Sequence, residues 1–284
     1  MKSAPRVVCF YENWARYRPP LGRFLPTNIP PHLCTHIHYV GAGVHAETLR
    51  VGPLDVFADL VTGGYRSTVE LREHNPDLKV LPMIGGSGQQ QDSLRAAAAT
   101  AESRKQLAEA AVEFLREHDF DGLDVDWKPP HAPEDHAGLL EALRAAFDRD
   151  TTSTGRRRLL LAVELTPHPD ELREHFDMER VTAAVDYANV LGYRYQDVGP
   201  YAAGEDQIVA FDDETSLQMK ARMAREAGLG GVAAWTVSLD DFRGFCTGEP
   251  FSYDPRSQGW HVGYRRGRPA DNTNAAYHSR LRRQ

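Results

Sequence analysis

The stretch at residues 120–130, which reads Phe-Asp-Gly-Leu-Asp-Val-Asp-Trp-Lys-Pro-Pro, limits what this chain can fold into more than any other part. Apolar and acidic residues alternate between positions 123 and 127. This is the pattern of a β-strand, because successive side chains of a strand point to opposite faces. The pattern predicts that Asp124, Asp126 and Lys128 project to one side. The two prolines that follow favour an end to the strand, so two carboxylates and one ammonium are expected together at its end.

Two interpretations of these three charges are open. Three alternating charges on their own are typical of a solvated strand end. The flanking Gly122 and Trp127, together with the apolar residues that precede them, favour a functional site, where titratable groups are gathered at one place.

The size and charge of the chain narrow its class. With 284 residues, 41% hydrophobic residues and no long apolar run, it is long enough for one large domain and is not expected to cross a membrane. The single domain that fits this length best is an α/β barrel, which typically has about 250 residues. A net charge of -7 argues against a nucleic-acid-binding surface.

Short apolar runs alternate with amphipathic helical segments along the chain, which predicts an α/β fold. A run such as residues 159–165, apolar almost throughout, is typical of a strand buried in a parallel sheet. The helix expected at residues 103–118 carries its apolar residues on one face, at Leu107, Ala111, Phe114 and Leu115. Further helices are expected around residues 139–147 and 216–227, and strands at residues 6–11, 35–40, 79–84, 123–127, 159–165, 187–194 and 231–236.

The acidic strand also resembles a family signature. Family-18 glycoside hydrolases, the chitinases and their relatives, carry Asp-Gly-x-Asp-x-Asp-Trp-Glu, and the final Glu is their catalytic acid. This chain matches every fixed position but the last, where Lys128 stands; the matching residues are Asp121, Gly122, Asp124, Asp126 and Trp127. The resemblance extends over residues 6–248 with one internal gap and implies a TIM (β/α)8-type barrel.

The internal gap implies an incomplete barrel. Where the family has a long loop, a seventh strand and usually a small inserted α+β domain, only residues 195–210 intervene before the next matching segment. Seven strands are therefore expected in place of eight. Such a barrel must close with a gap, use residues 207–211 as a substitute strand, or expose two sheet edges.

The lysine at position 128 implies that catalysis is lost. In the family, the Glu protonates the leaving glycosidic oxygen while the acetamide of the substrate attacks the anomeric carbon. A lysine titrates near 10.4, about 3 pH units or ~4 kcal/mol from the range where a general acid works well. No catalytic residue is therefore expected in the altered motif. The easier role for Lys128 is an ion pair that neutralises Asp124 and Asp126.

The resemblance also implies sugar-binding residues. Tyr193 matches the tyrosine that contacts the acetamide carbonyl, Arg194 replaces a cleft aspartate, and Trp235 matches the tryptophan beneath the central sugar. The expected function is binding of chitin or N-acetylglucosamine oligosaccharides without hydrolysis and without a cofactor. The residues expected to bind the sugar are Tyr11, Asp126, Trp127, Tyr193 and Trp235.

Three other functions remain open. In one, the chain is a weak glycosidase in which Glu12 or Glu164 replaces the lost acid. In a second, it is a scaffold or partner-binding protein with no sugar site. In a third, His36 and His38, as a His-x-His pair on one strand, hold zinc together with Asp124 or Asp126. His36 has a counterpart in the chitinase pattern, so no metal ligand is assigned.

The cysteines bear on the compartment. Cys9 and Cys34 have the spacing of the first disulfide in the animal chitinases that this chain resembles, which leaves Cys246 unpaired; three reduced thiols are the alternative. No signal peptide is recognised before the strand at residues 6–11, so either an export segment has been removed or the protein is not exported. The disulfide favours a secreted, extracellular protein.

The domain organisation follows from the extent of the resemblance and from the charge. Residues 1–248 are expected to form the barrel and residues 249–284 a poorly ordered tail. From residue 251 onward the tail has seven arginines against two aspartates, so binding of a polyanion by this segment is an open alternative.

Overall fold

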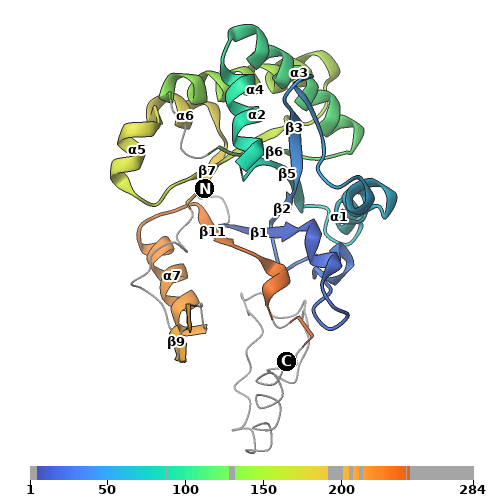
Figure 1. Ribbon diagram of the computed structural model, residues 1–284, viewed down its shortest axis with the longest axis vertical. Helices are drawn as coiled ribbons and strands as arrows, with labels where there is room; N and C mark the ends of the chain where they lie inside the picture. Colours follow the sequence, from blue (N-terminus) through green and yellow to red (C-terminus); the bar gives the residue numbers. More distant parts are fainter. Residues whose placement is uncertain are drawn as a thin grey trace, which may run out of the picture. The chain divides into compact units, whose positions relative to one another are not determined.

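Seven parallel strands form the central sheet of this computed structural model, which describes residues 5–86, 88–127, 132–190, 201–204, 207–210, 214–240 and 242–243. The strands follow the order β11-β1-β2-β5-β6-β7-β8, and the sheet curves into a nearly closed barrel (Figure 1). Their bounds are β1 Arg6–Glu12, β2 His36–Val40, β5 Lys79–Gly85, β6 Gly122–Asp126, β7 Leu160–Leu165, β8 Tyr187–Val190 and β11 Gly231–Ala234. The expected α/β barrel with seven strands is confirmed.

Helices follow most of these strands. They are α1 Gly64–Val69, α2 Gly88–Ala98, α3 Ala101–Glu117, α4 Pro133–Thr154, α5 Pro169–His175, α6 Met178–Ala184 and α7 Glu214–Glu226. Shorter helical turns are Asn13–Tyr17, Pro26–Asn28, Phe57–Val61, Glu70–Glu73 and Val237–Leu239. Two small antiparallel hairpins lie apart from the main sheet: β3 Ala42–His45 with β4 Arg50–Pro53, and β9 Tyr201–Gly204 with β10 Gln207–Ala210.

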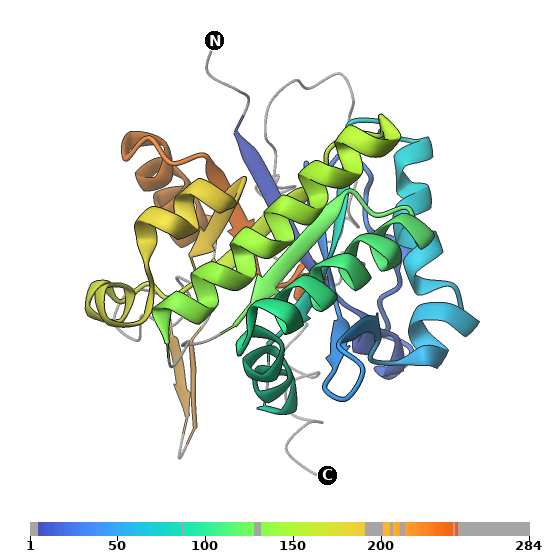
Figure 2. The ribbon, with the colours of Figure 1, turned by 90° about the horizontal axis from the view of Figure 1, so that it is seen from above.

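The longer helices form where the sequence provides both a start signal and an apolar face. Helix α3 begins after Thr100, whose hydroxyl accepts a hydrogen bond from the main-chain N–H of Ser103 at 3.0 Å. Its predicted apolar face is buried, as expected. Helix α4 begins at Pro133 and ends before Gly155, which has a left-handed φ of 68°. Helices α3 and α4 pack side by side across the outside of the barrel (Figure 2).

The pairing of strand β10 rules out one of the expected ways of closing the barrel. Strand β10, residues 207–210, pairs only with β9 and not with the main sheet, so its use as a substitute strand is wrong within the described residues. A hairpin closes across only two intervening residues, so β9 is a nearer partner for β10 than any barrel strand. Strands β8 and β11 therefore end the described sheet on its two sides.

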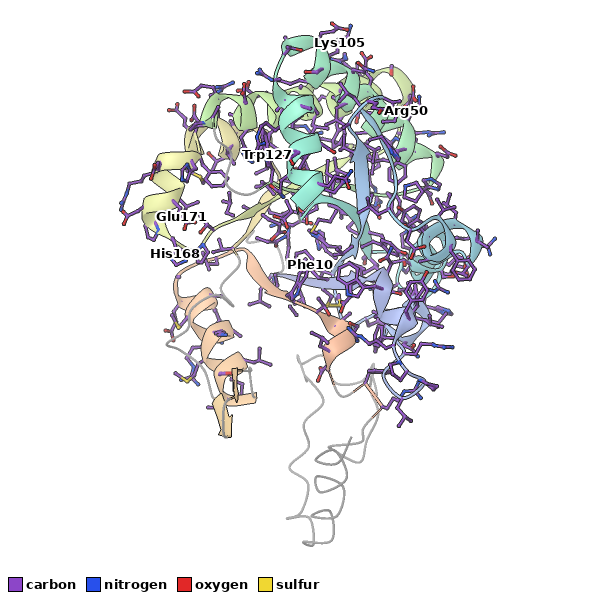
Figure 3. All side chains as sticks on the ribbon, viewed as in Figure 1. Phe10, Arg50, Lys105, Trp127, His168 and Glu171 are labelled. Atoms are coloured by element: carbon purple, nitrogen blue, oxygen red, sulfur yellow. A yellow bond between two sulfur atoms is a disulfide. The ribbon has the colours of Figure 1, made fainter. Side chains whose placement is uncertain are left out.

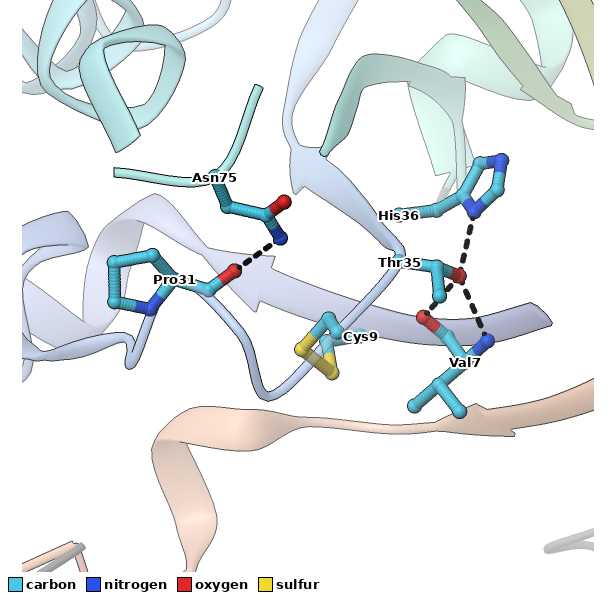
Figure 4. Close-up of a disulfide and its surroundings, with 7 residues drawn as sticks. Val7, Cys9, Pro31, Thr35, His36 and Asn75 are labelled. Atoms are coloured by element: carbon cyan, nitrogen blue, oxygen red, sulfur yellow. Dashed lines mark hydrogen bonds between the residues drawn. A yellow bond between two sulfur atoms is a disulfide. The ribbon is translucent and has the colours of Figure 1, made fainter. Parts of the chain in front are cut away.

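The predicted disulfide is confirmed. Cys9 on β1 is bonded to Cys34 just before β2, with their Cα atoms 6.0 Å apart (Figure 4). Cys246 lies outside the described residues, as does the whole of the tail from residue 249. Every strand of the described main sheet lies in one compact unit, Met1–Ser238, and a second unit spans Leu239–Gln284. No helix in the described ranges is long and apolar enough to cross a membrane.

Candidate functional site

The carboxylates of strand β6 face the barrel interior. Asp124 is 0% exposed and Asp126 4% exposed, so the interpretation as a solvated strand end is wrong. The strand is buried along its full length because β5 and β7 flank it on both sides. Asp121 has a different role. It lies just before β6, accepts a hydrogen bond from the main-chain N–H of Val80 at 2.9 Å and faces Arg72, so it joins two strands at the opposite end of the barrel.

His38 of β2 connects Asp124 to a tyrosine on the far side of the barrel interior. Its Nδ1 lies 2.7 Å from Oδ2 of Asp124, and its Nε2 lies 2.8 Å from the hydroxyl of Tyr187 on β8. Burial lowers the pKa of His38 to about 4, so the imidazole is neutral at neutral pH. A neutral ring satisfies both contacts when Nδ1–H donates to the carboxylate and Nε2 accepts from the tyrosine hydroxyl.

Glu164 of β7 is the second buried carboxyl beside Asp124. It is 1% exposed, and its Oε1 accepts a hydrogen bond from Nδ2 of Asn189 at 2.8 Å. Asn189 is also its register partner on β8. Burial raises the pKa of Glu164 well above its usual range, and the neighbouring charge of Asp124 raises it further. Ligand atoms of His38, Asp124 and Glu164 all lie within 4.8 Å of one another.

His36 stands outside this group, although it is on the same strand as His38. Its Nδ1 lies 2.8 Å from the hydroxyl of Thr35, which in turn contacts the main chain of Val7 (Figure 4). Its ring meets Tyr187 edge to face. The zinc set proposed from the sequence is therefore only half assembled: His38 and Asp124 meet, and His36 does not join them.

The end of β6 is fixed by a tight approach from β5. The main-chain carbonyl of Asp126 accepts hydrogen bonds from the N–H of Gly86 at 2.9 Å and from the Gln91 side chain at 2.8 Å. Gly85 has φ of 101°, and a Cβ there would collide with the same carbonyl. Only glycine permits this contact, which sets the position of Asp126 next to Gly85 and Gly86.

The predicted aromatic residues divide into exposed and buried ones. Trp235 is 41% exposed just after β11, and its ring centroid is 5.1 Å from that of Phe10 on β1. Tyr11 is buried against Phe24 and Tyr39. Trp127 is buried at the end of β6; Figure 3 labels it together with Phe10. Trp235 is therefore the most exposed of these three aromatic residues, and sugar contacts for all three stay predictions.

The two carboxyls considered as replacement acids are both turned away from solvent. Glu12 is buried and its Oε1 accepts a hydrogen bond from Arg18 at 2.6 Å. Arg18 also donates to the main-chain carbonyl of Ser238 at 2.6 Å. Glu164 belongs to the buried group beside Asp124. Three further residues of the predicted site, Lys128, Tyr193 and Arg194, lie outside the described residues.

Sequence reasoning missed Tyr187 and Asn189. Both were placed in the expected strand at residues 187–194, but nothing marked them as part of a site. A usable signal was the acidic Glu164 inside an otherwise apolar strand, because a buried carboxyl needs polar neighbours on the adjacent strands.

Known proteins share both sequence and fold with this chain. The family model described as Glycosyl hydrolases family 18 matches residues 6–198. The endochitinase of Brugia malayi is 35% identical over 188 residues, which are 65% of this chain and 37% of that protein. Human chitinase-3-like protein 2 is 31% identical over 195 residues, which are 68% of this chain and 49% of that protein. The chain thus spans half or less of the length of these two relatives.

Solved structures show the same architecture. The immunomodulatory active chitinase TsES1 from Trichuris suis superposes with a TM-score of 0.80 at 19% identity, over 86% of this chain and 95% of that one. Human YKL-39 superposes with a TM-score of 0.77 at 22% identity, over 85% of this chain and 94% of that one. The fold, the motif on β6 and the family match over more than half of the chain agree, and the chain belongs to family 18 of the glycosyl hydrolases.

Proposed function

We propose that this protein binds chitin or N-acetylglucosamine oligosaccharides and does not hydrolyse them. The observation that carries the proposal is the lysine at position 128, in a motif whose other fixed residues are kept. The family chemistry needs a proton donor at this position, and an ammonium with an ordinary pKa is a poor one at neutral pH.

Glu12 and Glu164, the two carboxyls considered as a substitute acid, are poorly placed for this role. A general acid must come within hydrogen-bond reach of the glycosidic oxygen, at about 2.6–3.2 Å. Glu12 is engaged by Arg18, and Glu164 is buried between Asp124 and Asn189. These contacts favour loss of hydrolysis over the alternative of a weak glycosidase.

The exposed face of Trp235 supports retention of sugar binding. A sugar ring packs its apolar C–H face on an aromatic ring, and polar groups beside the ring fix its orientation. Trp235 is backed by Phe10, which holds the indole in place. Among the solved structures with this fold, human YKL-39 is described as a pseudo-chitinase with retained chitooligosaccharide binding properties, which is a precedent for binding without cleavage.

Retention on chitin beads tests the proposal against the scaffold alternative. The intact chain should be retained on chitin and released by N-acetylglucosamine oligosaccharides. Trp235→Ala should lower retention about tenfold, because an aromatic stacking contact is worth up to ~1.5 kcal/mol beyond the area it buries. Phe57→Ala is the matched control, since Phe57 is also an exposed aromatic residue and lies on a separate surface turn. A folded wild-type chain that passes through the beads would leave the scaffold function.

The proposal also covers the extent of the barrel and the compartment in which the protein works. The barrel spans residues 1–248 and the arginine-rich segment at residues 249–284 takes no part in sugar binding, so a chain that ends at residue 248 should be retained on chitin like the full chain. The protein works outside the cell, which the bond between Cys9 and Cys34 supports because disulfides persist in oxidising compartments.

A further inference from the structure

The group formed by His38, Asp124 and Glu164, here called the interior triad, is not explained by sugar binding. Its members lie on three strands of the barrel, β2, β6 and β7, and their side chains meet inside the barrel. All three side chains are at most 1% exposed, so none of them can contact a ligand that stays in solvent. Two carboxyls and an imidazole at this depth lose most of their hydration, and a compensating interaction is therefore needed.

We propose that the interior triad is a binding site for a divalent transition metal ion, with zinc as the ion that fits best. Its ligand atoms are one imidazole nitrogen and two carboxylate oxygens, which suit zinc and its first-row neighbours. The proposal goes beyond sugar binding and does not depend on it.

The spacing of the ligand atoms is close to what one zinc ion needs. Donor atoms bound to zinc at about 2.0–2.2 Å in a tetrahedral arrangement stand ~3.4 Å apart. In the triad, Nδ1 of His38 and Oδ2 of Asp124 are 2.7 Å apart, and all ligand atoms fall within 4.8 Å of one another. Nδ1 of His38 and Oδ2 of Asp124 must therefore move apart by ~0.7 Å for both to bind one ion.

His38 and Glu164 are each held by a hydrogen bond to a residue on the edge strand β8. Metal ligands in proteins commonly have such a second partner. Tyr187 contacts Nε2 of His38 at 2.8 Å, so Nδ1 can bind the ion while Nε2–H donates to the tyrosine oxygen. Asn189 donates to Oε1 of Glu164 at 2.8 Å, which leaves Oε2 as the ligand atom. The Glu164 carboxyl also forms a side-chain hydrogen bond with Asp124, and a bound ion would take the place of the proton between them.

The charge of the triad is also better balanced by a cation than by its own members. Asp124 and Glu164 are two carboxyls buried side by side. A proton on Glu164 neutralises one of the two, and a divalent ion neutralises both. Binding of the ion displaces that proton to solvent, so one proton leaves the triad as one divalent ion enters.

The position of the triad gives an ion a route to it. Strand β8 carries Tyr187 and Asn189 and has a paired neighbour on one side only within the described sheet. Edge strands open at lower free energy than strands in the middle of a sheet. The ion can therefore enter by local opening at β8 without unfolding of the barrel.

Metal analysis of the purified full chain tests the site. We expect the chain stripped with EDTA and dialysed to bind one zinc ion per molecule in a calorimetric titration with zinc chloride, and to bind no magnesium. Glu164→Gln and His38→Gln should each weaken zinc binding at least ~100-fold, and Asn189→Ala ~10- to 100-fold, because it only orients Glu164. His36→Gln is the matched control, since it is a histidine two residues away on the same strand that is outside the triad.

The outcomes separate clearly. Zinc binding by the wild type and His36→Gln, lost in both triad variants, supports the site. Circular dichroism identifies folded samples, and Glu164→Gln, which keeps the shape of the side chain, decides the question if His38→Gln does not fold. A folded wild type that takes up no zinc overturns the proposal, since a proton alone would then neutralise the carboxyls. Equal zinc binding in all variants overturns it as well.

Discussion

Lys128 follows Trp127 just beyond strand β6, at the position where a glycosidase of this family needs a carboxylic acid. Restoring that acid is the obvious repair. Its neighbour Asp124 is, however, committed to other partners, with His38 at 2.7 Å and Glu164 beside it. The resemblance of the sequence also predicts that Arg194 stands where the family has its cleft aspartate. A single substitution therefore restores the acid but not its surroundings.

We predict that Lys128→Glu leaves hydrolysis at least ~100-fold below that of an active chitinase, the size of a typical general-acid contribution. The measurement is product release from an N-acetylglucosamine hexamer, with Lys128→Gln as the uncharged control. Turnover within about tenfold of an active enzyme would mean that the groove and the surroundings of Asp124 are still suited to catalysis.

His136, in the first turn of α4, packs against apolar residues and should make stability depend on pH. Its ring is fully buried between Trp127 and Phe176, and neither ring nitrogen has a hydrogen-bond partner among the described residues. Burial lowers the pKa of His136 to about 4. The unfolded chain, with a histidine pKa near 6.5, therefore takes up a proton at a higher pH than the folded chain does.

His136 therefore lowers the stability of the folded chain as the pH falls. The contribution of His136 is complete above about pH 6.5 and is lost as the pH falls toward 4, by up to ~3 kcal/mol. We predict that His136→Phe makes the free energy of unfolding fall less steeply between pH 6.5 and 4.5 than in the wild type, as measured by urea unfolding at each pH. Identical slopes for the two proteins would show that the ring is hydrated or hydrogen-bonded in solution.

The bond between Cys9 and Cys34 links β1 to the start of β2 across a separation of 25 residues. A closed loop of this length restricts the unfolded chain by ~3–4 kcal/mol in the chain-entropy account. We predict that the double variant Cys9→Ser, Cys34→Ser loses about this much free energy of unfolding. A reductant should lower the stability of the wild type and leave the double variant unchanged; the opposite pattern would contradict the role of this bond.

At the scale of elements, the sequence predicted those parts that carry a strong pattern. The apolar strands and helix α3 have clear periodicity, and their positions agree with the structure to within a few residues. Helix α2 reads Gly-Gln-Gln-Gln-Asp-Ser-Leu-Arg-Ala-Ala-Ala and has Leu94 as its only large apolar residue, so it lacks the periodic signal and was not predicted. The hairpin of β3 and β4 is too short to stand out.

Across the whole molecule, the motif predicted the family and the barrel, but not what the interior holds. His38 meets a residue 86 positions away in Asp124 and one 149 positions away in Tyr187. Such contacts depend on the order and register of strands that are distant in sequence, which local patterns do not specify. That β8 and β11 are the edge strands of the described sheet agrees with the shortened segment, whereas the pairing of β10 with β9 had to be seen in the structure.

We propose that this family-18 barrel binds its sugar and leaves it intact. Its most direct test is calorimetric titration of the purified chain with an N-acetylglucosamine tetramer and hexamer, with product analysis of the same sample. We predict saturable binding and no shorter oligosaccharides. Cleavage of the hexamer would contradict the argument from Lys128, and no heat of binding from a folded sample at millimolar sugar would mean that the shortened barrel has lost its groove.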